Sequence, residues 1–149
     1  MNNLRKLRKA LGVTQRQLQA MTGIQQTNIS RFEMGKSSFT IGNFVRIAEV
    51  LCTSVDYLLE RTDVAAPYPP ARDAADNLRR LRERRHKTQI RLHTDTGIDQ
   101  SLISRYESAQ RPLSLTAIEV LADYYGVSTD FLLDRTDVET PYPPKSVIL

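Results

Sequence analysis

Apolar residues recur along the chain at the spacing of amphipathic helices. Leu4, Leu7 and Leu11 lie three or four positions apart, which places them on one face of a helix at about residues 2–11. The same spacing recurs further on, at Phe44, Ile47, Ala48 and Leu51. No stretch shows the strict alternation of apolar and polar residues that is typical of a half-buried strand. The pattern therefore predicts an all-α protein.

The helical pattern occurs twice, because the chain contains an internal repeat with a constant offset of 74 residues. Ile29-Ser30-Arg31 recurs as Ile103-Ser104-Arg105, and Arg61-Thr62-Asp63-Val64 recurs as Arg135-Thr136-Asp137-Val138. Roughly 28 of the 68 aligned positions are identical. The repeat predicts two domains of about 65 residues, each near the lower size limit for independent folding.

Domain boundaries follow from the repeat and from a proline-rich segment. We expect a first domain at 1–66, a linker at 67–75, a second domain at 76–140 and a C-terminal tail at 141–149. Proline favours an extended chain, as in Pro67-Tyr68-Pro69-Pro70. Because this tetrapeptide recurs at 141–144, two interpretations stay open. It is a linker, or it belongs to each fold, with its tyrosine packed against the helices.

Five short helices are expected in each copy. N-cap candidates for the second and fifth helices are Thr14, Ser54, Thr88 and Ser128, since a hydroxyl can accept a bond from a free backbone N–H. Gly23 and Gly97 follow about two helical turns after the first of these caps, where a turn with positive φ is required. The third helix is expected at about 25–33 and 99–107.

The predicted second and third helices of both copies, and the turn between them, share a characteristic set of residues. The first copy has Thr14-Gln15, Leu18, Gly23-Ile24, Gln26, Ile29-Ser30-Arg31, Glu33 and Gly35. The second copy has Thr88-Gln89, Leu92, Gly97-Ile98, Gln100, Ile103-Ser104-Arg105 and Glu107. Both resemble the Cro/phage-repressor (Xre-type) helix-turn-helix family. The resemblance implies two tandem five-helix lambda-repressor-like DNA-binding domains.

Candidate base-reading residues lie on the outer face of the third helix. In such motifs the start of the second motif helix enters the major groove, where base edges are distinguishable. Spacing turns Ile29 and Phe32 inward and leaves other side chains outward. The outward set in the two copies is Gln26, Thr27, Ser30, Arg31, Gln100, Ser101, Ser104 and Arg105. The alternative is that these residues form only a solvated helix face.

Further roles are implied by the resemblance. Gln15 and Gln89 stand where family members touch a phosphate, and Lys36 and Arg111 are candidate backbone contacts in the loops after the third helices. The alternative is that the two glutamines are polar helix-start residues without a ligand and that the two cations are solvated surface residues. Ion pairs with a structural role are implied between the first and third helices. Their members are Arg8 with Glu33 and Arg82 with Glu107. A partly buried pair of this kind fixes geometry without guaranteeing net stability.

Several positions depart from the family pattern. Gln19 and His93 replace the alanine expected where the two motif helices pack, so the helix angle differs or these side chains turn to solvent. In the second copy, residues of the first are replaced by His86 for Gly12, Ala109 for Gly35 and Leu102 for Asn28. Leu102 contacts a thymine methyl group or belongs to a protein-binding surface.

Composition narrows the function classes. Residues 1–74 carry 10 Lys/Arg against 6 Asp/Glu, whereas 75–149 carry 11 of each, with six basic residues gathered at 79–87. We find no signal-peptide pattern and no stretch of about 20 apolar residues that would span a membrane. Cys52 stands alone, which fits a reducing cytoplasm. Two histidines without a Cys or carboxylate cluster predict no metal site, and no catalytic or phosphate-binding motif is present.

The sequence therefore predicts a non-enzymatic, cytoplasmic regulator that binds double-stranded DNA and acts as a repressor. Two linked reading heads would form a pseudo-dimer, and a homodimer of the chain stays open. No cofactor, small-molecule ligand or membrane partner is expected. The alternative is an antitoxin or adaptor that uses the same helices for protein binding, with Leu102 and Val147-Ile148-Leu149 at the contact.

Overall fold

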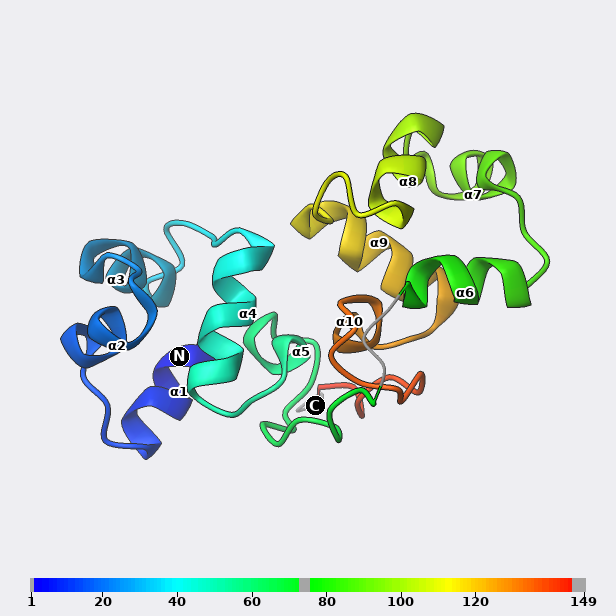
Figure 1. The fold of residues 1–149 in the computed structure, drawn as a ribbon. Helices are drawn as coiled ribbons and strands as arrows, with labels where there is room; N and C mark the ends of the chain where they lie inside the picture. Colours follow the sequence, from blue (N-terminus) through cyan, green and yellow to red (C-terminus); the bar gives the residue numbers. More distant parts are fainter. Residues whose placement is uncertain (1, 73–75, 146–149) are drawn as a thin grey trace. The chain divides into compact units, whose positions relative to one another are not determined.

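The structure of the protein is a computed structural model, which describes residues 2–72 and 76–145 (Figure 1). The chain divides into two compact units. Unit 1 holds the chain up to Pro67 together with the segment from Tyr142, and unit 2 holds Tyr68–Pro141. Helices and no strand occur in these described ranges, so the all-α prediction is confirmed.

Five helices form unit 1, and five more form unit 2. The helices of unit 1 are α1 (Asn3–Ala10), α2 (Gln15–Thr22), α3 (Gln26–Glu33), α4 (Ile41–Val50) and α5 (Val55–Leu58). The helices of unit 2 are α6 (Asn77–Arg84), α7 (Gln89–Thr96), α8 (Gln100–Glu107), α9 (Leu115–Tyr125) and α10 (Thr129–Leu132). The order and nearly all the lengths repeat, as the offset of 74 residues predicts.

Hydroxyl side chains begin the helices that the sequence assigned to them. The Thr14 hydroxyl accepts a hydrogen bond from the backbone N–H of Gln17, and Thr14 N–H donates to Oε1 of Gln17, which completes a capping box. The predicted caps Thr88, Ser54 and Ser128 also accept the expected backbone bonds. At the other end of α2 and α7, Gly23 and Gly97 have φ of 78° and 77°, as predicted.

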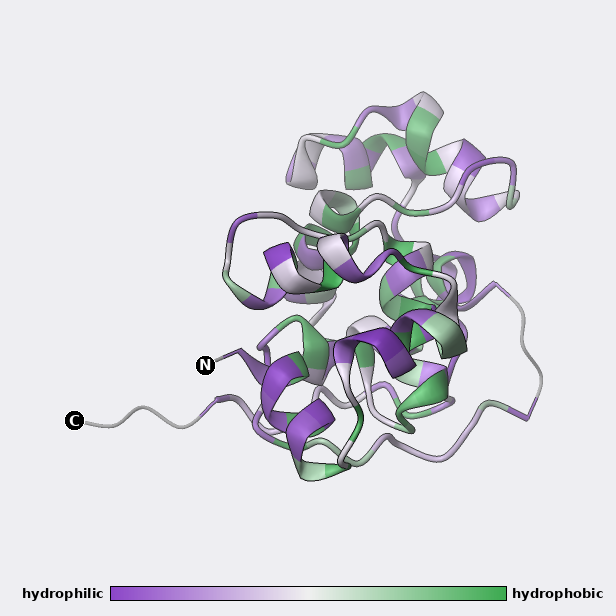
Figure 2. Ribbon diagram, turned by 90° about the vertical axis from the view of Figure 1, so that its left-hand side faces the viewer, coloured by the Kyte–Doolittle hydropathy of each residue, from purple (hydrophilic) through white to green (hydrophobic). Residues whose placement is uncertain are grey.

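Each unit encloses its own apolar core. Each helix carries both apolar and polar residues (Figure 2), and most of the apolar ones are buried, Met21 and Ile90 being exceptions. The largest fully buried side chains are Leu4, Leu18, Ile29, Phe44, Ile47 and Leu58 in unit 1 and Leu81, Leu92, Ile103, Ile118 and Leu121 in unit 2. Helices α3 and α8 are anchored to these cores by Ile29 and Ile103, which are wholly buried.

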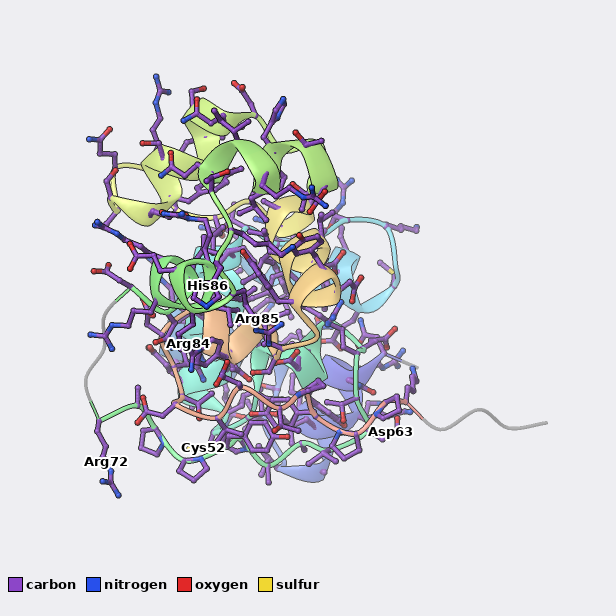
Figure 3. The ribbon with its side chains drawn as sticks, turned by 90° about the vertical axis from the view of Figure 1, so that its right-hand side faces the viewer. Cys52, Asp63, Arg72, Arg84, Arg85 and His86 are labelled. Atoms are coloured by element: carbon purple, nitrogen blue, oxygen red, sulfur yellow. The ribbon has the colours of Figure 1, made fainter. Side chains whose placement is uncertain are left out.

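One expected core position is wrong. Leu11 is 52% exposed, because α1 ends at Ala10 and the chain turns away at Gly12, where φ is 69°. The same left-handed turn occurs in unit 2 at His86, with φ of 55°, and Cys52 takes it after α4 with φ of 52° (both labelled in Figure 3). Cys52 is thus an exposed capping residue, at a position where unit 2 has Gly126.

The proline-rich segment after unit 1 packs within unit 2. Ala71 N–H donates to the carbonyl of Arg135 at 3.2 Å, and Arg72 N–H donates to the Asp137 carboxylate at 3.0 Å. The Tyr68 hydroxyl donates to the carbonyl of Pro141 at 3.0 Å. Unit 2 therefore holds residues 68–72 by one main-chain bond and two bonds that involve side chains, beside an isolated antiparallel bridge between Pro70 and Thr136.

Candidate nucleic-acid interface

The paired helices α2–α3 and α7–α8 present an outer face in each unit. On α3, Thr27 and Arg31 are exposed, while Gln26 and Ser30 are half-buried. On α8 the matching residues are all exposed, namely Gln100, Ser101, Ser104 and Arg105. Lys36 and Arg111 are exposed in the loops that follow these helices. The predicted reading residues are thus accessible in both units.

A chain of polar contacts connects the interior of unit 1 to its outer face. The Arg8 guanidinium donates to both carboxylate oxygens of Glu33, at 2.9 and 2.6 Å, and this pair is buried. Gln15 Nε2 donates to the same carboxylate at 3.5 Å, and its own Oε1 accepts from Gln26 Nε2 at 2.7 Å. The amide of Gln26 is therefore held in place from the core outward.

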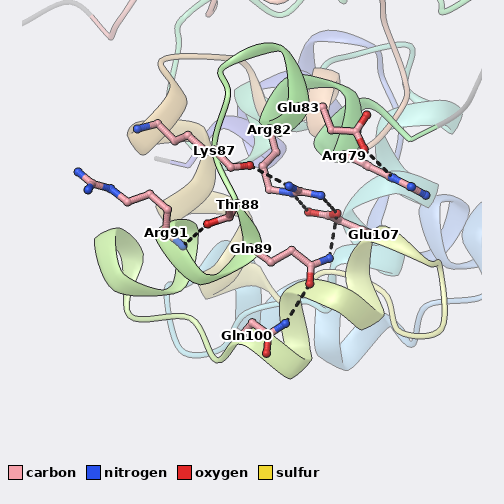
Figure 4. Close-up of polar contacts among 9 residues, drawn as sticks. All are labelled: Arg79, Arg82, Glu83, Lys87, Thr88, Gln89, Arg91, Gln100 and Glu107. Atoms are coloured by element: carbon pink, nitrogen blue, oxygen red, sulfur yellow. Dashed lines mark hydrogen bonds and ion pairs between the residues drawn. The ribbon is translucent and has the colours of Figure 1, made fainter.

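Unit 2 repeats this chain residue for residue (Figure 4). Arg82 donates to Glu107 at 2.7 and 2.9 Å, and this hydrogen bond raises the pKa of the guanidinium further. Gln89 Nε2 donates to Glu107 at 3.2 Å, and Gln100 Nε2 donates to Gln89 Oε1 at 3.1 Å. Because Glu107 is charged and buried, it fixes the direction in which the two glutamine amides point.

The residues that replace the expected alanine take different partners. Gln19 Oε1 accepts from the backbone N–H of Gln26 at 2.6 Å, so it caps the start of α3, where Gln25 makes no side-chain cap. His93 Nδ1 instead contacts the carbonyl of Ile98 at 2.7 Å. Sequence analysis missed this cap. The signal that could have predicted it is a polar residue, Gln19, seven positions before a helix start at which Gln25 makes no side-chain cap bond.

A groove beside the reading helix of unit 1 is lined with cations. It has a volume of about 550 Å³, and its lining residues are Arg8, Lys9, Gly12, Val13, Thr14, Gln15, Arg16 and Gln26. Lys9 and Arg16 are exposed at this groove. The matching positions of unit 2 are Glu83, which pairs with Arg79 at 3.1 Å, and Ile90, which is 66% exposed. The two units therefore differ in charge beside the reading helix.

Other kinds of site find no support in the part of the chain that the structure describes. No cluster of three His, Cys, Asp or Glu side chains that could hold a metal ion occurs in those residues. None of the helices described there is long and apolar enough to cross a membrane. The polar chain and the outer helix face are the features that remain to be explained.

Comparison with known families agrees with this geometry. A family model described as "Helix-turn-helix" matches residues 4–58, and one described as "Helix-turn-helix domain" matches residues 73–135. No curated protein and no solved structure matches the chain. The two matches lie on the two structural units, one on each. The chain therefore belongs to the helix-turn-helix family, with a Cro/C1-type domain followed by a second helix-turn-helix domain in tandem.

Proposed function

We propose that the protein is a sequence-specific regulator that binds double-stranded DNA through α3 and α8. The observation that carries this proposal is the polar chain that ends at Gln26 and Gln100. A glutamine held by one amide hydrogen keeps its other donor and its carbonyl for an adenine edge. One turn further along, the exposed Arg31 and Arg105 have the donor geometry that guanine accepts.

Phosphate contacts fix the register of the protein on the duplex. We assign them to Gln15 and Gln89 at the starts of α2 and α7, and to Lys36 and Arg111 in the loops. In unit 1 the cationic groove adds Lys9 and Arg16, which lie next to Gln15. Backbone N–H groups at a helix start also favour a phosphate. These contacts supply affinity, whereas the outer face of α3 supplies sequence preference.

Two linked heads would act as a pseudo-dimer. Proteins of this motif usually place two reading helices in half-sites about one helical turn apart. Once one head is bound, a covalent link gives the other an effective concentration of about millimolar. Because the heads are not identical, we expect an imperfect palindrome or a direct repeat. Repression is the proposed outcome, since a protein seated on promoter DNA blocks access to it.

Selection of bound sequences from random duplex DNA tests this function. The wild-type chain should enrich two adjacent motifs, and Gln26→Ala with Arg31→Ala should remove the preference in one motif only. The matched variant in unit 2 is Gln100→Ala with Arg105→Ala, which should remove the other. Binding should weaken steeply between 50 and 200 mM salt through counterion release. Failure to enrich any sequence at low salt would refute the proposal.

A further inference from the structure

The starts of the two reading helices carry different chemistry. The residue before α3 is Gln25, whereas the residue before α8 is Asp99. Asp99 makes no cap bond to the helix, and its carboxylate instead accepts a hydrogen bond from the Ser101 hydroxyl at 2.7 Å. Both residues are exposed. A carboxylate therefore lies beside the outward face of α8, where the first unit has a neutral amide.

The hydrogen bond between Ser101 and Asp99 determines which hydrogen-bonding groups the two side chains leave available to a base. Since the only O–H of Ser101 is donated to Asp99, the remaining lone pairs of both side chains are acceptors. The same bond keeps the pKa of the Asp99 carboxyl below its ordinary value. The carboxylate is thus charged at neutral pH, and the pair presents acceptors alone.

Only one base matches a pair of this kind in the major groove. Guanine shows two acceptors, thymine shows an acceptor and a methyl group, and adenine shows an acceptor beside its amino group. An ionised acceptor is repelled by each of these acceptors. Cytosine shows its N4 amino group with no acceptor of its own beside it, and aspartate is a recognised partner for that group.

We propose that Asp99 and Ser101 make the second reading head select a cytosine at the start of its half-site, a preference that the first head lacks. The proposal rests on the proposed DNA binding and adds a base that only one half-site carries. It also gives the chain a direction on its operator, because the two half-sites become chemically distinct. The cost is repulsion of phosphates by Asp99, which lowers binding to DNA of any sequence.

Selection from random duplex DNA tests the pair with matched exchanges between the units. The wild-type chain should enrich cytosine about fivefold or more at one position of one half-site. Asp99→Gln installs the residue that precedes α3, so α8 should fold, and it should remove this enrichment while the other selected bases remain. Gln25→Asp combined with Thr27→Ser should create a second cytosine in the other half-site.

A milder variant guards against a folding defect. Ser101→Ala keeps the Asp99 carboxylate but removes the hydroxyl that holds it in one position. The cytosine enrichment should therefore fall, while the helix content measured by circular dichroism stays unchanged. Enrichment of two half-sites without cytosine, or cytosine that survives Asp99→Gln, would overturn the inference and leave DNA binding intact. Absence of any enriched sequence at low salt would instead overturn the proposed function, and the inference with it.

Discussion

Two ion pairs that share helix α6 allow the energetic role of burial to be measured. Arg82 pairs with Glu107 at 2.7 Å, with side chains only 12% and 4% exposed. Arg79 pairs with Glu83 at 3.1 Å, with side chains 57% and 55% exposed. Removing one member of a buried pair leaves an uncompensated charge and costs about 3–5 kcal/mol. An exposed pair one helical turn apart contributes about 0.3–0.5 kcal/mol.

We therefore expect Glu107→Gln to lower the free energy of unfolding of unit 2 by about 3 kcal/mol, and Glu83→Gln by less than about 0.5 kcal/mol. Hydrogen exchange of the full chain measures this, since peptides from α6 to α9 report unit 2 and peptides from α1 to α4 report unit 1. Glu107→Gln should also weaken DNA binding, because Gln89 and Gln100 lose their anchor. Equal losses for the two variants would refute the reasoning.

Further predictions concern strain, charge and pH. Gly35→Ala should lower the free energy of unfolding of unit 1 by about 0.5–1 kcal/mol, and Ala109→Gly should raise that of unit 2 by the same amount. The reason is the positive φ, which is 74° at Gly35 and 59° at Ala109. Hydrogen exchange of the full chain measures both changes. Arg16→Ile should lower the slope of log affinity against log salt by about 1, and Ile90→Arg should raise it by the same amount, in fluorescence anisotropy titrations. Burial raises the pKa of Tyr125 to about 12, so the free energy of unfolding falls as pH rises from 10 toward 12, because the unfolded chain ionises this hydroxyl first. Tyr125→Phe should abolish that fall in urea titrations, and it should add about 1 kcal/mol at neutral pH, since the buried hydroxyl has no hydrogen-bond partner among the described residues. A Tyr125→Phe chain that is less stable than the wild type both at neutral pH and near pH 12 would contradict this account of the buried hydroxyl.

Helix starts and turns could be predicted because their signals are local. Thr14 and Ser54 cap helices through their own hydroxyls, and Gly23 marks a turn that other residues adopt at a cost. The positive φ at His86 and Ala109 was also within reach, because the aligned residues of the first copy are glycines. Comparison of the two copies therefore predicts a left-handed backbone at these two positions, which the sequence of the second copy alone does not.

Contacts between distant segments could not be predicted from such signals. Asn3 begins the repeated Asn-Leu-Arg motif, but its role depends on carbonyls more than 50 residues away in the sequence. Its amide donates to the carbonyl oxygens of Tyr57 at 2.8 Å and Thr62 at 3.3 Å. The docking of residues 68–72 in unit 2 also depends on distant partners, since its three hydrogen bonds join residues more than 60 positions apart in the sequence.

The two units keep the same route from the core to the glutamine that we propose reads a base, but they differ at positions that we propose meet phosphate. The buried pair and both glutamines are identical in the two copies, whereas Lys9 and Arg16 are replaced by Glu83 and Ile90. Two phosphate contacts account for about a tenfold fall in affinity between 50 and 200 mM salt, so a head that lacks them binds more weakly and depends less on salt. A tethered head tolerates this loss, because an effective concentration of about millimolar lets even a weak head engage its half-site. Under the proposed function, the first head would provide most of the affinity, and the second would be free to specialise in discrimination between sequences.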